Sequence, residues 1–310
     1  MLLKDINMET DTGDQASNLR TLVDKLNNNE NIENRPEPNP VTKVITVTSG
    51  KGGVGKSSVS VNLAIALAKM NKKVILLDAD LGLANVNVML GVIPKYNIYH
   101  VVKGHKTIQE ILTTTPEGLD VIAGASGYAM LANLPKKERV RIINEFMSLS
   151  GYDFMIIDTG AGVGDNVLGF ALPADEVLII TTPEPTAITD AYGMIKSIIL
   201  LDPNKSIQLV VNRAGSSLEA KKVSEKITGI TKQFLNTVIK PGGFIYDDEH
   251  VGKSVRRQKP FLLQYPGSKA SSCIKVIASR LNNLDVKHSS SGGGLSSFFK
   301  RVFTQGDDTI

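Results

Sequence analysis

The chain has 310 residues, 42% hydrophobic and 21% charged, which is typical of a folded globular protein. A single cysteine, Cys273, excludes a disulfide framework. Without a run of 18 apolar residues or a signal-peptide core, we expect a cytoplasmic protein with no transmembrane helix. The net charge of 35 − 31 = +4 is uneven, because residues 1–40 carry four bases and eight acids (4 − 8 = −4). The remaining +8 is compatible with an anionic partner surface.

Residues 1–40 read as an appendage to a larger domain. Asn27 to Pro40 is rich in asparagine and proline and is predicted to be a linker. Asp14 to Leu26 has apolar residues at helical spacing, but thirteen residues are too few for a stable isolated helix in water. This segment therefore either packs on its own domain or folds on a partner.

The stretch Val44 to Ser57 reads V-I-T-V-T-S-G-K-G-G-V-G-K-S, an apolar strand entering a glycine-rich loop. It fits the phosphate-binding pattern G-x-x-x-x-G-K-[ST], in which backbone N–H groups and a helix N-terminus surround phosphate oxygens. Lys56 is expected at the β- and γ-phosphates and Ser57 on Mg²⁺. A second lysine, Lys51, is costly so close to the first unless a polyanion is shared. The residues expected to contact the nucleotide here are Gly50, Lys51, Gly52, Gly53, Val54, Gly55, Lys56, Ser57 and Ser58.

Two further apolar runs end in carboxylates. Lys73 to Leu77 is a predicted buried strand followed by Asp78 and Asp80. Phe154 to Gly162 reads F-M-I-I-D-T-G-A-G, a Walker B strand whose Asp158 holds Mg²⁺ through water. Carboxylates at the carboxyl ends of strands beside a P-loop can hold Mg²⁺ or orient a water molecule.

The remaining elements alternate between strand and helix, which predicts an α/β fold over residues 41–285: a mainly parallel twisted sheet with helices on both faces. Between the sites we expect short helices over Ile98 to Leu112, a strand over Leu119 to Gly124, an amphipathic helix over Leu134 to Leu149, and strands over Glu176 to Thr182 and Ile207 to Val211. The run Lys253, Arg256, Arg257 and Lys259 is either a solvated helix face or a patch that faces a membrane or partner.

Residues 286–310 are predicted to form a separate segment, made of a tether and an amphipathic helix. Ser289 to Gly294 is a predicted flexible tether. After it an apolar stripe with helical spacing runs beside Lys300 and Arg301, as in helices that lie in a membrane interface. Docking of this helix on its own core is the alternative. The stripe consists of Leu295, Phe298, Phe299, Val302 and Phe303.

The loop K-G-G-V-G-K-S, with Lys51 after its first glycine, resembles the deviant Walker A loop of the MinD/ParA ATPases. The resemblance implies an ATP-dependent homodimer in which Lys51 contacts the nucleotide of the other subunit. It implies that Asp80 positions the attacking water and that Asp78 supports the metal shell. It places Asn212, with Arg213, and Asp248 at the adenine, although Tyr246 stands where the family usually has proline. An amide suits adenine, and no guanine-reading aspartate follows a strand, so ATP is favoured over GTP.

The sequence D-Q-A-x-x-L-R resembles the activator motif of the flagellar branch of this family, which includes FlhG, FleN and YlxH. It implies that this motif stimulates an FlhF-type signal-recognition GTPase, and that the protein is a slow ATP hydrolase controlling flagellar number and placement. Flagellar switch-ring proteins and the anionic inner face of the cell membrane are the other implied partners, and no specific nucleic acid is expected. The motif residues are Asp14, Gln15, Ala16, Leu19 and Arg20.

Other readings stay open. A division-site MinD protein would share the core and tail but lack the N-terminal motif, and a ParA protein would bind DNA non-specifically. A regulatory protein that binds ATP without hydrolysing it is also compatible with the motifs. One cysteine excludes an iron–sulfur ATPase like nitrogenase iron protein, and the lack of tyrosine in residues 286–310 excludes a bacterial P-loop tyrosine kinase.

Overall fold

The computed structural model describes residues 41–80, 85–124, 136–283 and 294–304. All of these belong to the compact unit Pro40–Ile310, and the predicted linker and partner-binding motif of residues 1–40 lie outside the described residues. No helix within the described ranges is long and apolar enough to span a bilayer.

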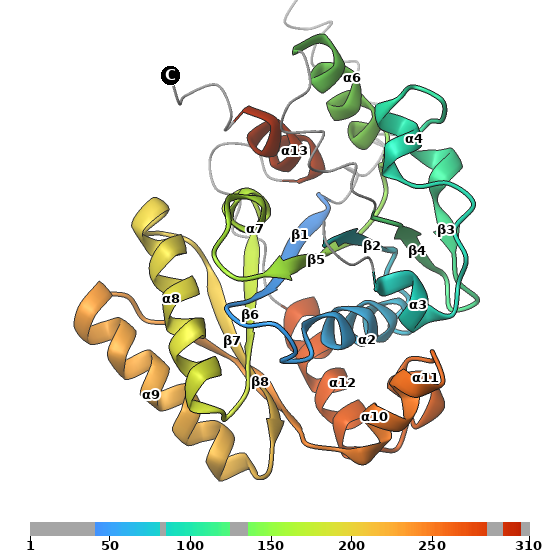
Figure 1. Cartoon of the computed structure of the whole chain (residues 1–310). Helices are drawn as coiled ribbons and strands as arrows, with labels where there is room; N and C mark the ends of the chain where they lie inside the picture. Colours follow the sequence, from blue (N-terminus) through green and yellow to red (C-terminus); the bar gives the residue numbers. More distant parts are fainter. Residues whose placement is uncertain (1–40, 81–84, 125–135, 284–293, 305–310) are drawn as a thin grey trace, which may run out of the picture. The chain divides into compact units, whose positions relative to one another are not determined.

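An eight-stranded sheet runs through this unit in the order β3-β4-β2-β5-β1-β6-β7-β8 (Figure 1). Neighbouring strands are parallel except β3, which is antiparallel to β4. The mainly parallel sheet predicted from the sequence is therefore confirmed. The strands are β1 (Lys43–Ser49), β2 (Val74–Ala79), β3 (Thr113–Thr114), β4 (Leu119–Ile122), β5 (Phe154–Ala161), β6 (Glu176–Thr181), β7 (Ile207–Ala214) and β8 (Lys240–Tyr246).

Successive strand residues point to opposite faces of the sheet and enter different apolar clusters. In β2, Leu76 packs in one cluster while Ile75 and Leu77 pack in another. In β7, Val210 belongs to the first face and Leu209 to a third cluster on the opposite face. Because both faces are apolar, the central strands are nearly continuous hydrophobic runs, as expected for a parallel sheet covered on both sides.

Two groups of helices cover these faces (Figure 1). The first face is covered by α2 (Lys56–Ala68), α3 (Val86–Leu90), α10 (Glu249–Arg256), α11 (Phe261–Gln264) and α12 (Lys269–Asn282). The second face is covered by α4 (Ile98–Val102), the 3₁₀ turn η1 (Gln109–Ile111), α6 (Lys136–Met147), α7 (Asp165–Ala171), α8 (Pro185–Leu201), α9 (Ser217–Leu235) and α13 (Leu295–Thr304).

Strand β8 was not predicted from the sequence. Its residues read K-P-G-G-F-I-Y, and proline and glycine are unfavourable inside a strand. The structure places it at the edge of the sheet, where a proline without an N–H group is tolerated. The register shifts by one residue between Pro241 and Gly243, and this bulge accommodates Gly243 at φ 132°.

Helix α13 lies where the sequence predicts it, but its apolar stripe is buried against the domain. Leu295, Phe298 and Phe299 are 6%, 1% and 0% exposed, and Val302 packs beside them. The Phe299 ring stacks on Phe146 of α6 with centroids 3.7 Å apart. The structure therefore has the docked arrangement that the sequence left open as the alternative, and membrane binding of this stripe stays a prediction. A surface apolar enough to enter a membrane is also apolar enough to complete a core. The Phe303 side chain lies outside the described residues.

Candidate active site

The loop between β1 and α2 has a backbone that only glycine accommodates at two positions. Gly53 and Gly55 have φ of 80° and 92°, in the left-handed region. A Cβ atom on Gly55 would lie 2.3 Å from Nδ2 of Asn212, and one on Gly50 would lie 2.1 Å from the Asp190 carbonyl oxygen. The glycines thus set both the turn and the close approach of the loop to its neighbours.

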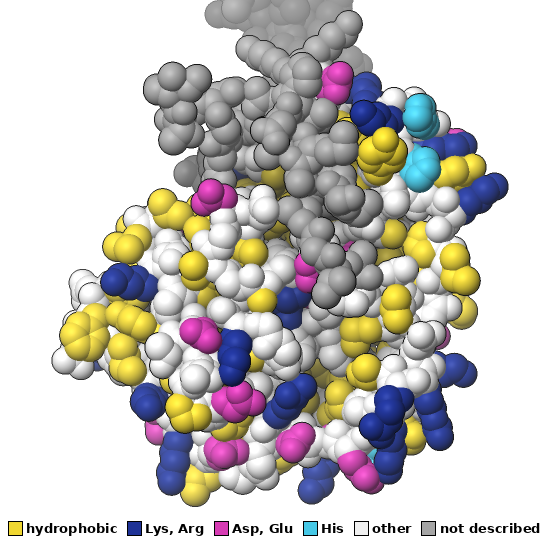
Figure 2. Space-filling view, in the orientation of Figure 1, with side chains coloured by type: hydrophobic (Ala, Val, Ile, Leu, Met, Phe, Trp, Pro, Cys, Tyr) yellow, Lys and Arg dark blue, Asp and Glu magenta, His cyan; other side chains and the backbone are white. Residues whose placement is uncertain are grey.

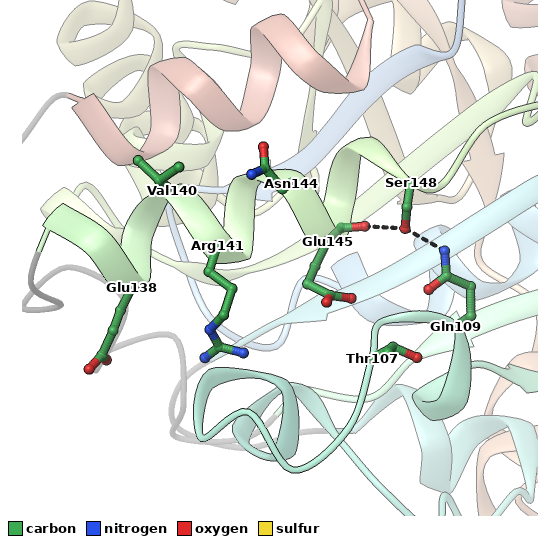
Figure 3. Close-up of a pocket in the computed structure, with 8 residues that line it drawn as sticks. All are labelled: Thr107, Gln109, Glu138, Val140, Arg141, Asn144, Glu145 and Ser148. Carbon is green, nitrogen blue, oxygen red and sulfur yellow. Dashed lines mark hydrogen bonds between the residues drawn. The ribbon is translucent and has the colours of Figure 1, made fainter.

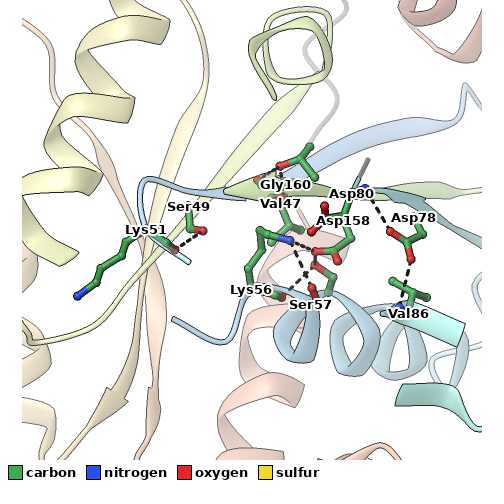
Figure 4. Close-up of polar contacts among 12 residues, drawn as sticks. Val47, Ser49, Lys51, Lys56, Ser57, Asp78, Asp80, Val86, Asp158 and Gly160 are labelled. Carbon is green, nitrogen blue, oxygen red and sulfur yellow. Dashed lines mark hydrogen bonds and ion pairs between the residues drawn. The ribbon is translucent and has the colours of Figure 1, made fainter. Parts of the chain in front are cut away.

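Lys56, the P-loop lysine, points to the carboxyl end of β5 (Figure 4). Its Nζ lies 2.9 Å from Oδ1 of Asp158 and donates to Oγ of Ser57 at 3.3 Å. Ser60, one turn into α2, donates its hydroxyl to the same Asp158 oxygen at 2.8 Å. Lys56 and Asp158 are both buried, with 7% and 1% of their surface exposed. The lysine and the Walker B carboxylate are therefore held together at the floor of the site.

Asp78 and Asp158 lie in the carboxyl-terminal halves of two adjacent strands, opposite each other in the register of β2 and β5. Asp78 accepts hydrogen bonds from the backbone N–H groups of Asp80 and Val86, both at 3.2 Å. Burial, and then the negative charge of Asp158, raise the pKa of Asp78 to about 7. Two neighbouring buried carboxylates beside a serine hydroxyl form a donor set that suits Mg²⁺, which favours oxygen ligands.

Asp80 reaches the same site from the end of β2. A cavity of about 520 Å³ is lined by Asp80 together with Gly52, Gly53, Lys56, Ser57 and Ser58. A Cβ atom on Gly160 would lie 3.7 Å from Oδ1 of Asp80, so this carboxylate lies beside a glycine near the carboxyl end of β5. The structure thus brings together the P-loop and all three predicted aspartates.

Lys51, the second lysine of the loop, extends away from Lys56 (Figure 4). Its Nζ lies 3.1 Å from Oε2 of Glu184 and donates to Oγ1 of Thr186 at 2.7 Å. The Lys51 side chain is 37% exposed and that of Glu184 is 57% exposed. Neither of these partners, both at the start of α8, was predicted from the sequence.

Asn212, at the end of β7, donates its side-chain N–H to the Val54 carbonyl oxygen at 2.7 Å. This contact ties the predicted adenine site directly to the P-loop. Arg213 is exposed and has φ of 54°. The side chains of both residues lie outside the lining of the P-loop cavity, so their contact with a base stays a prediction.

Asp248, the other predicted adenine contact, is occupied as the N-cap of α10. Its carboxylate accepts from the N–H groups of His250 at 3.0 Å and Ala270 at 3.1 Å. Burial alone would raise the pKa of Asp248, but the hydrogen bonds from Ala270 and His250 outweigh it and lower that pKa. The prediction of a base contact here is not tested, whereas the capping role is evident.

A second cavity of about 650 Å³ lies beside α6, and two of its charged residues, Arg141 and Glu145, have structural partners (Figure 3). Arg141 donates to the carbonyl oxygens of Val101 at 2.9 Å and Val102 at 2.6 Å. The Glu145 carboxylate accepts from the Ile108 N–H at 2.8 Å. These groups hold the α4 and η1 segments against α6, and we assign them no reaction.

The basic run after the nucleotide site is exposed. Arg256, Arg257 and Lys259 lie on the surface, and basic side chains gather over α10 and α11 at lower right in Figure 2. Lys253 instead pairs with Glu249 at 2.9 Å. The choice between a solvated face and a partner-facing patch stays open for this run.

Comparison with known proteins identifies relatives of this chain. The profile of the ParA family, described as the NUBPL iron-transfer P-loop NTPase, matches residues 40–282. The antiactivator FleN of Pseudomonas aeruginosa is 38% identical over 242 residues, covering 78% of this chain and 86% of FleN. The flagellum site-determining protein YlxH of Helicobacter pylori is 36% identical over 297 residues, covering 93% and 97%. The Aquifex aeolicus MinC:MinD cell division complex superposes with a TM-score of 0.65 at 27% identity, covering 82% of this chain and 100% of that one.

Proposed function

The chain belongs to the ParA/MinD family of P-loop NTPases, and we propose that it is a slow ATP hydrolase that works as a dimerisation switch in flagellar placement. The observation that carries the proposal is the opposite placement of its two loop lysines. Lys56 lies buried on Asp158, while Lys51 lies at the surface on Glu184. One lysine thus serves the protein's own nucleotide, and the other is available to a second subunit.

ATP binding requires Lys56 to exchange its partner. Its Nζ must leave Asp158 for the β- and γ-phosphates, which frees the carboxylate. Ser57, with Asp158 and Asp78, would then hold Mg²⁺, which neutralises charge on the phosphate oxygens. Asp80, beside Gly160 in the same cavity, is the group that orients the attacking water. Asn212 and Arg213 with Asp248 are proposed at the adenine.

Dimerisation follows from the surface position of Lys51. An exposed ion pair such as Lys51–Glu184 contributes only about 0–1 kcal/mol, so it is readily exchanged. The phosphates of a nucleotide in a facing subunit are a stronger partner, because they carry more charge in a site from which water is excluded. ATP is therefore proposed to bridge two subunits, and its hydrolysis to release them.

The test distinguishes binding of ATP by one subunit from ATP-dependent dimerisation. Lys51→Ala is expected to bind ATP but stay monomeric, whereas Asp80→Ala is expected to accumulate as an ATP-bound dimer by light scattering. Lys222→Ala, on the exposed face of α9, is the matched control and should behave as the unaltered protein. An Asp80→Ala protein that stays monomeric with ATP and Mg²⁺ would rule out the nucleotide-bridged dimer.

The flagellar role rests on similarity to FleN and YlxH and on the motif Asp14 to Arg20. We propose that this motif stimulates an FlhF-type GTPase and that switch-ring proteins are further partners. A peptide of residues 14–26 should accelerate GTP hydrolysis, and Gln15→Ala or Leu19→Ala should weaken that effect. Equal stimulation by altered and unaltered peptides would remove the activator role of this motif, while leaving the ATPase and the similarity to FleN and YlxH intact.

Membrane attachment is proposed for α13 from the cytoplasmic side. The same stripe that packs on α6 would have to leave it and enter an anionic lipid interface. For a single tail, binding to the membrane competes with docking on α6, so attachment is weak. Two tails on one ATP dimer act at a high effective concentration and attach more strongly, so ATP controls residence at the membrane.

A further inference from the structure

The outer edge of β8 is a surface that the proposed ATPase role does not use. Among the described strands, β8 pairs with β7 and lies last in the sheet. Helices α9 and α12 flank it, one on each face (Figure 1). Lys240 and Pro241 blunt the first half of the strand, because proline offers no N–H group for pairing. The second half, Phe244 to Tyr246, carries an aromatic pair with ring centroids 5.0 Å apart.

Two hollows adjoin this edge. One of about 730 Å³ lies on the α9 side, and one of about 310 Å³ lies on the α12 side. Gly243, Phe244 and Arg280 line both, so the two hollows meet at the strand. Val238 in the first and Val276 in the second are 66% and 51% exposed. The edge therefore has apolar side chains exposed on both of its faces.

The rims of the hollows are basic. Among the residues that line them, Lys221, Lys232, Lys269 and Arg280 are opposed by Glu225 alone, a balance of 4 − 1 = +3. Glu225 lies 3.7 Å from Lys221 and is exposed, so it compensates little of this charge. Two copies joined edge to edge would bring these cations together, and such like-charge contacts are costly. The charge therefore favours an acidic occupant over a second copy of this chain.

We propose that the outer edge of β8 binds an extended acidic segment of a partner protein by strand addition. A strand added beside β8 points its side chains alternately to the α9 side and the α12 side. Its apolar side chains can then enter the two hollows while its carboxylates reach Lys232 on the α9 side and Arg280, which lines both hollows. Main-chain hydrogen bonds provide affinity in such complexes, and the side-chain hollows provide specificity.

The bulge limits the partner's length. Pairing of β8 with β7 shifts register at Gly243, which Pro241 precedes, and is irregular again between Val211 and Ala214, opposite the end of β8. Regular pairing along this strand is therefore short. A short segment fits this edge, and its affinity depends strongly on the charged rim.

The test uses the full chain and a fluorescein-labelled eight-residue peptide in which the pattern glutamate, valine, valine, glutamate occurs twice. Each face of this peptide strand alternates acid and valine. Anisotropy is expected to show binding at least about tenfold tighter than for the same peptide with lysine in place of glutamate, since like-charge contacts cost several kcal/mol. Lys232→Glu and Arg280→Glu should each weaken binding about tenfold. Lys222→Glu, an exposed lysine of α9 outside the hollows, is the matched control.

A third peptide keeps every side chain but carries an N-methyl group on every backbone amide, so that neither edge of the peptide can donate N–H groups to a strand. Strand addition predicts that it binds at least about tenfold more weakly, because its paired N–H groups are lost. Binding as tight as that of the first peptide would overturn strand addition. Equal binding of the lysine peptide, or equal weakening by Lys222→Glu, would overturn the acidic specificity. Self-association that Lys232→Glu abolishes would assign the edge to a second copy. ATP binding, which none of these variants touches, serves as the control for folding.

Discussion

The centre of the sheet and the docked helix α13 bury their important residues by different means. At the centre, Lys56 at the start of α2 and Asp158 of β5 are joined by a directional ion pair. At α13, Phe299 stacks on Phe146 through apolar contact, which is not directional. The first arrangement suits one kind of ligand, a polyanion with its cation. The second can be exchanged for any other apolar surface, including a membrane.

The largest expected effect concerns Lys56. Lys56→Ala removes the charge that faces both Asp158 and the phosphates, and ATP affinity should fall about 100-fold or more by calorimetry. It also leaves Asp158 buried without its cation, which should lower the free energy of unfolding by about 3–5 kcal/mol.

The double variant Lys56→Ala with Asp158→Asn separates these two losses. It removes the buried negative charge and should regain much of the stability in urea unfolding, while ATP affinity stays lost. Recovered ATP binding in the double variant would contradict the role given to Lys56.

The second prediction compares the two stacked rings. Phe146 lies on α6 inside the domain core, so Phe146→Ala should cost about 3–5 kcal/mol of stability. Phe299→Ala should cost less in urea unfolding, because α13 can undock while the domain stays folded. Hydrogen exchange in residues 295–304 should then be faster in Phe299→Ala. Equal stability losses would show that α13 is an integral part of the core.

The third prediction concerns exchange of α13 between the two surfaces. Sedimentation with anionic liposomes should increase with ATP and decrease about tenfold or more in Phe298→Glu, because a charge on the apolar face opposes insertion. Lys222→Glu, far from the stripe in the sequence, controls for the change in net charge. Attachment insensitive to both ATP and Phe298→Glu would leave α13 as a core helix only.

The P-loop, the Walker B strand and the parallel sheet could be predicted because their chemistry is local. Gly53 and Gly55 indicate a left-handed backbone, and Asp158 directly follows the apolar run at the start of β5. The contacts between these segments follow from strand adjacency, which the fold class implies.

What could not be predicted depends on distant partners. The sequence of strand β8 does not indicate a strand, because it contains Pro241 and two glycines. These residues are tolerated because β8 lies at the edge of the sheet. The partners of Lys51 lie more than 130 residues away, at Glu184 and Thr186. The periodicity of α13 indicates an apolar face, but Phe146 decides where that face lies.

The smallest effect is expected at Ser60. Its hydroxyl tests whether directional hydrogen bonds to Asp158 stabilise the centre of the sheet. Its hydroxyl has one proton and two acceptors, Oδ1 of Asp158 at 2.8 Å and the Lys56 carbonyl oxygen at 3.1 Å. The carboxylate is the stronger acceptor, and a hydrogen bond to a charged group contributes about 1.5–3 kcal/mol. Alanine recovers part of this because it favours a helix by up to about 0.7 kcal/mol.

Ser60→Ala should therefore lower the free energy of unfolding by about 1–2 kcal/mol in urea. In an Asp158→Asn background the acceptor is neutral, and the same substitution should cost about half as much, since neutral hydrogen bonds contribute about 0.5–1.5 kcal/mol. The difference between the two costs measures the coupling of Ser60 to the carboxylate. Identical costs in both backgrounds would mean that the hydroxyl serves the Lys56 carbonyl and that Lys56 alone holds Asp158 in place.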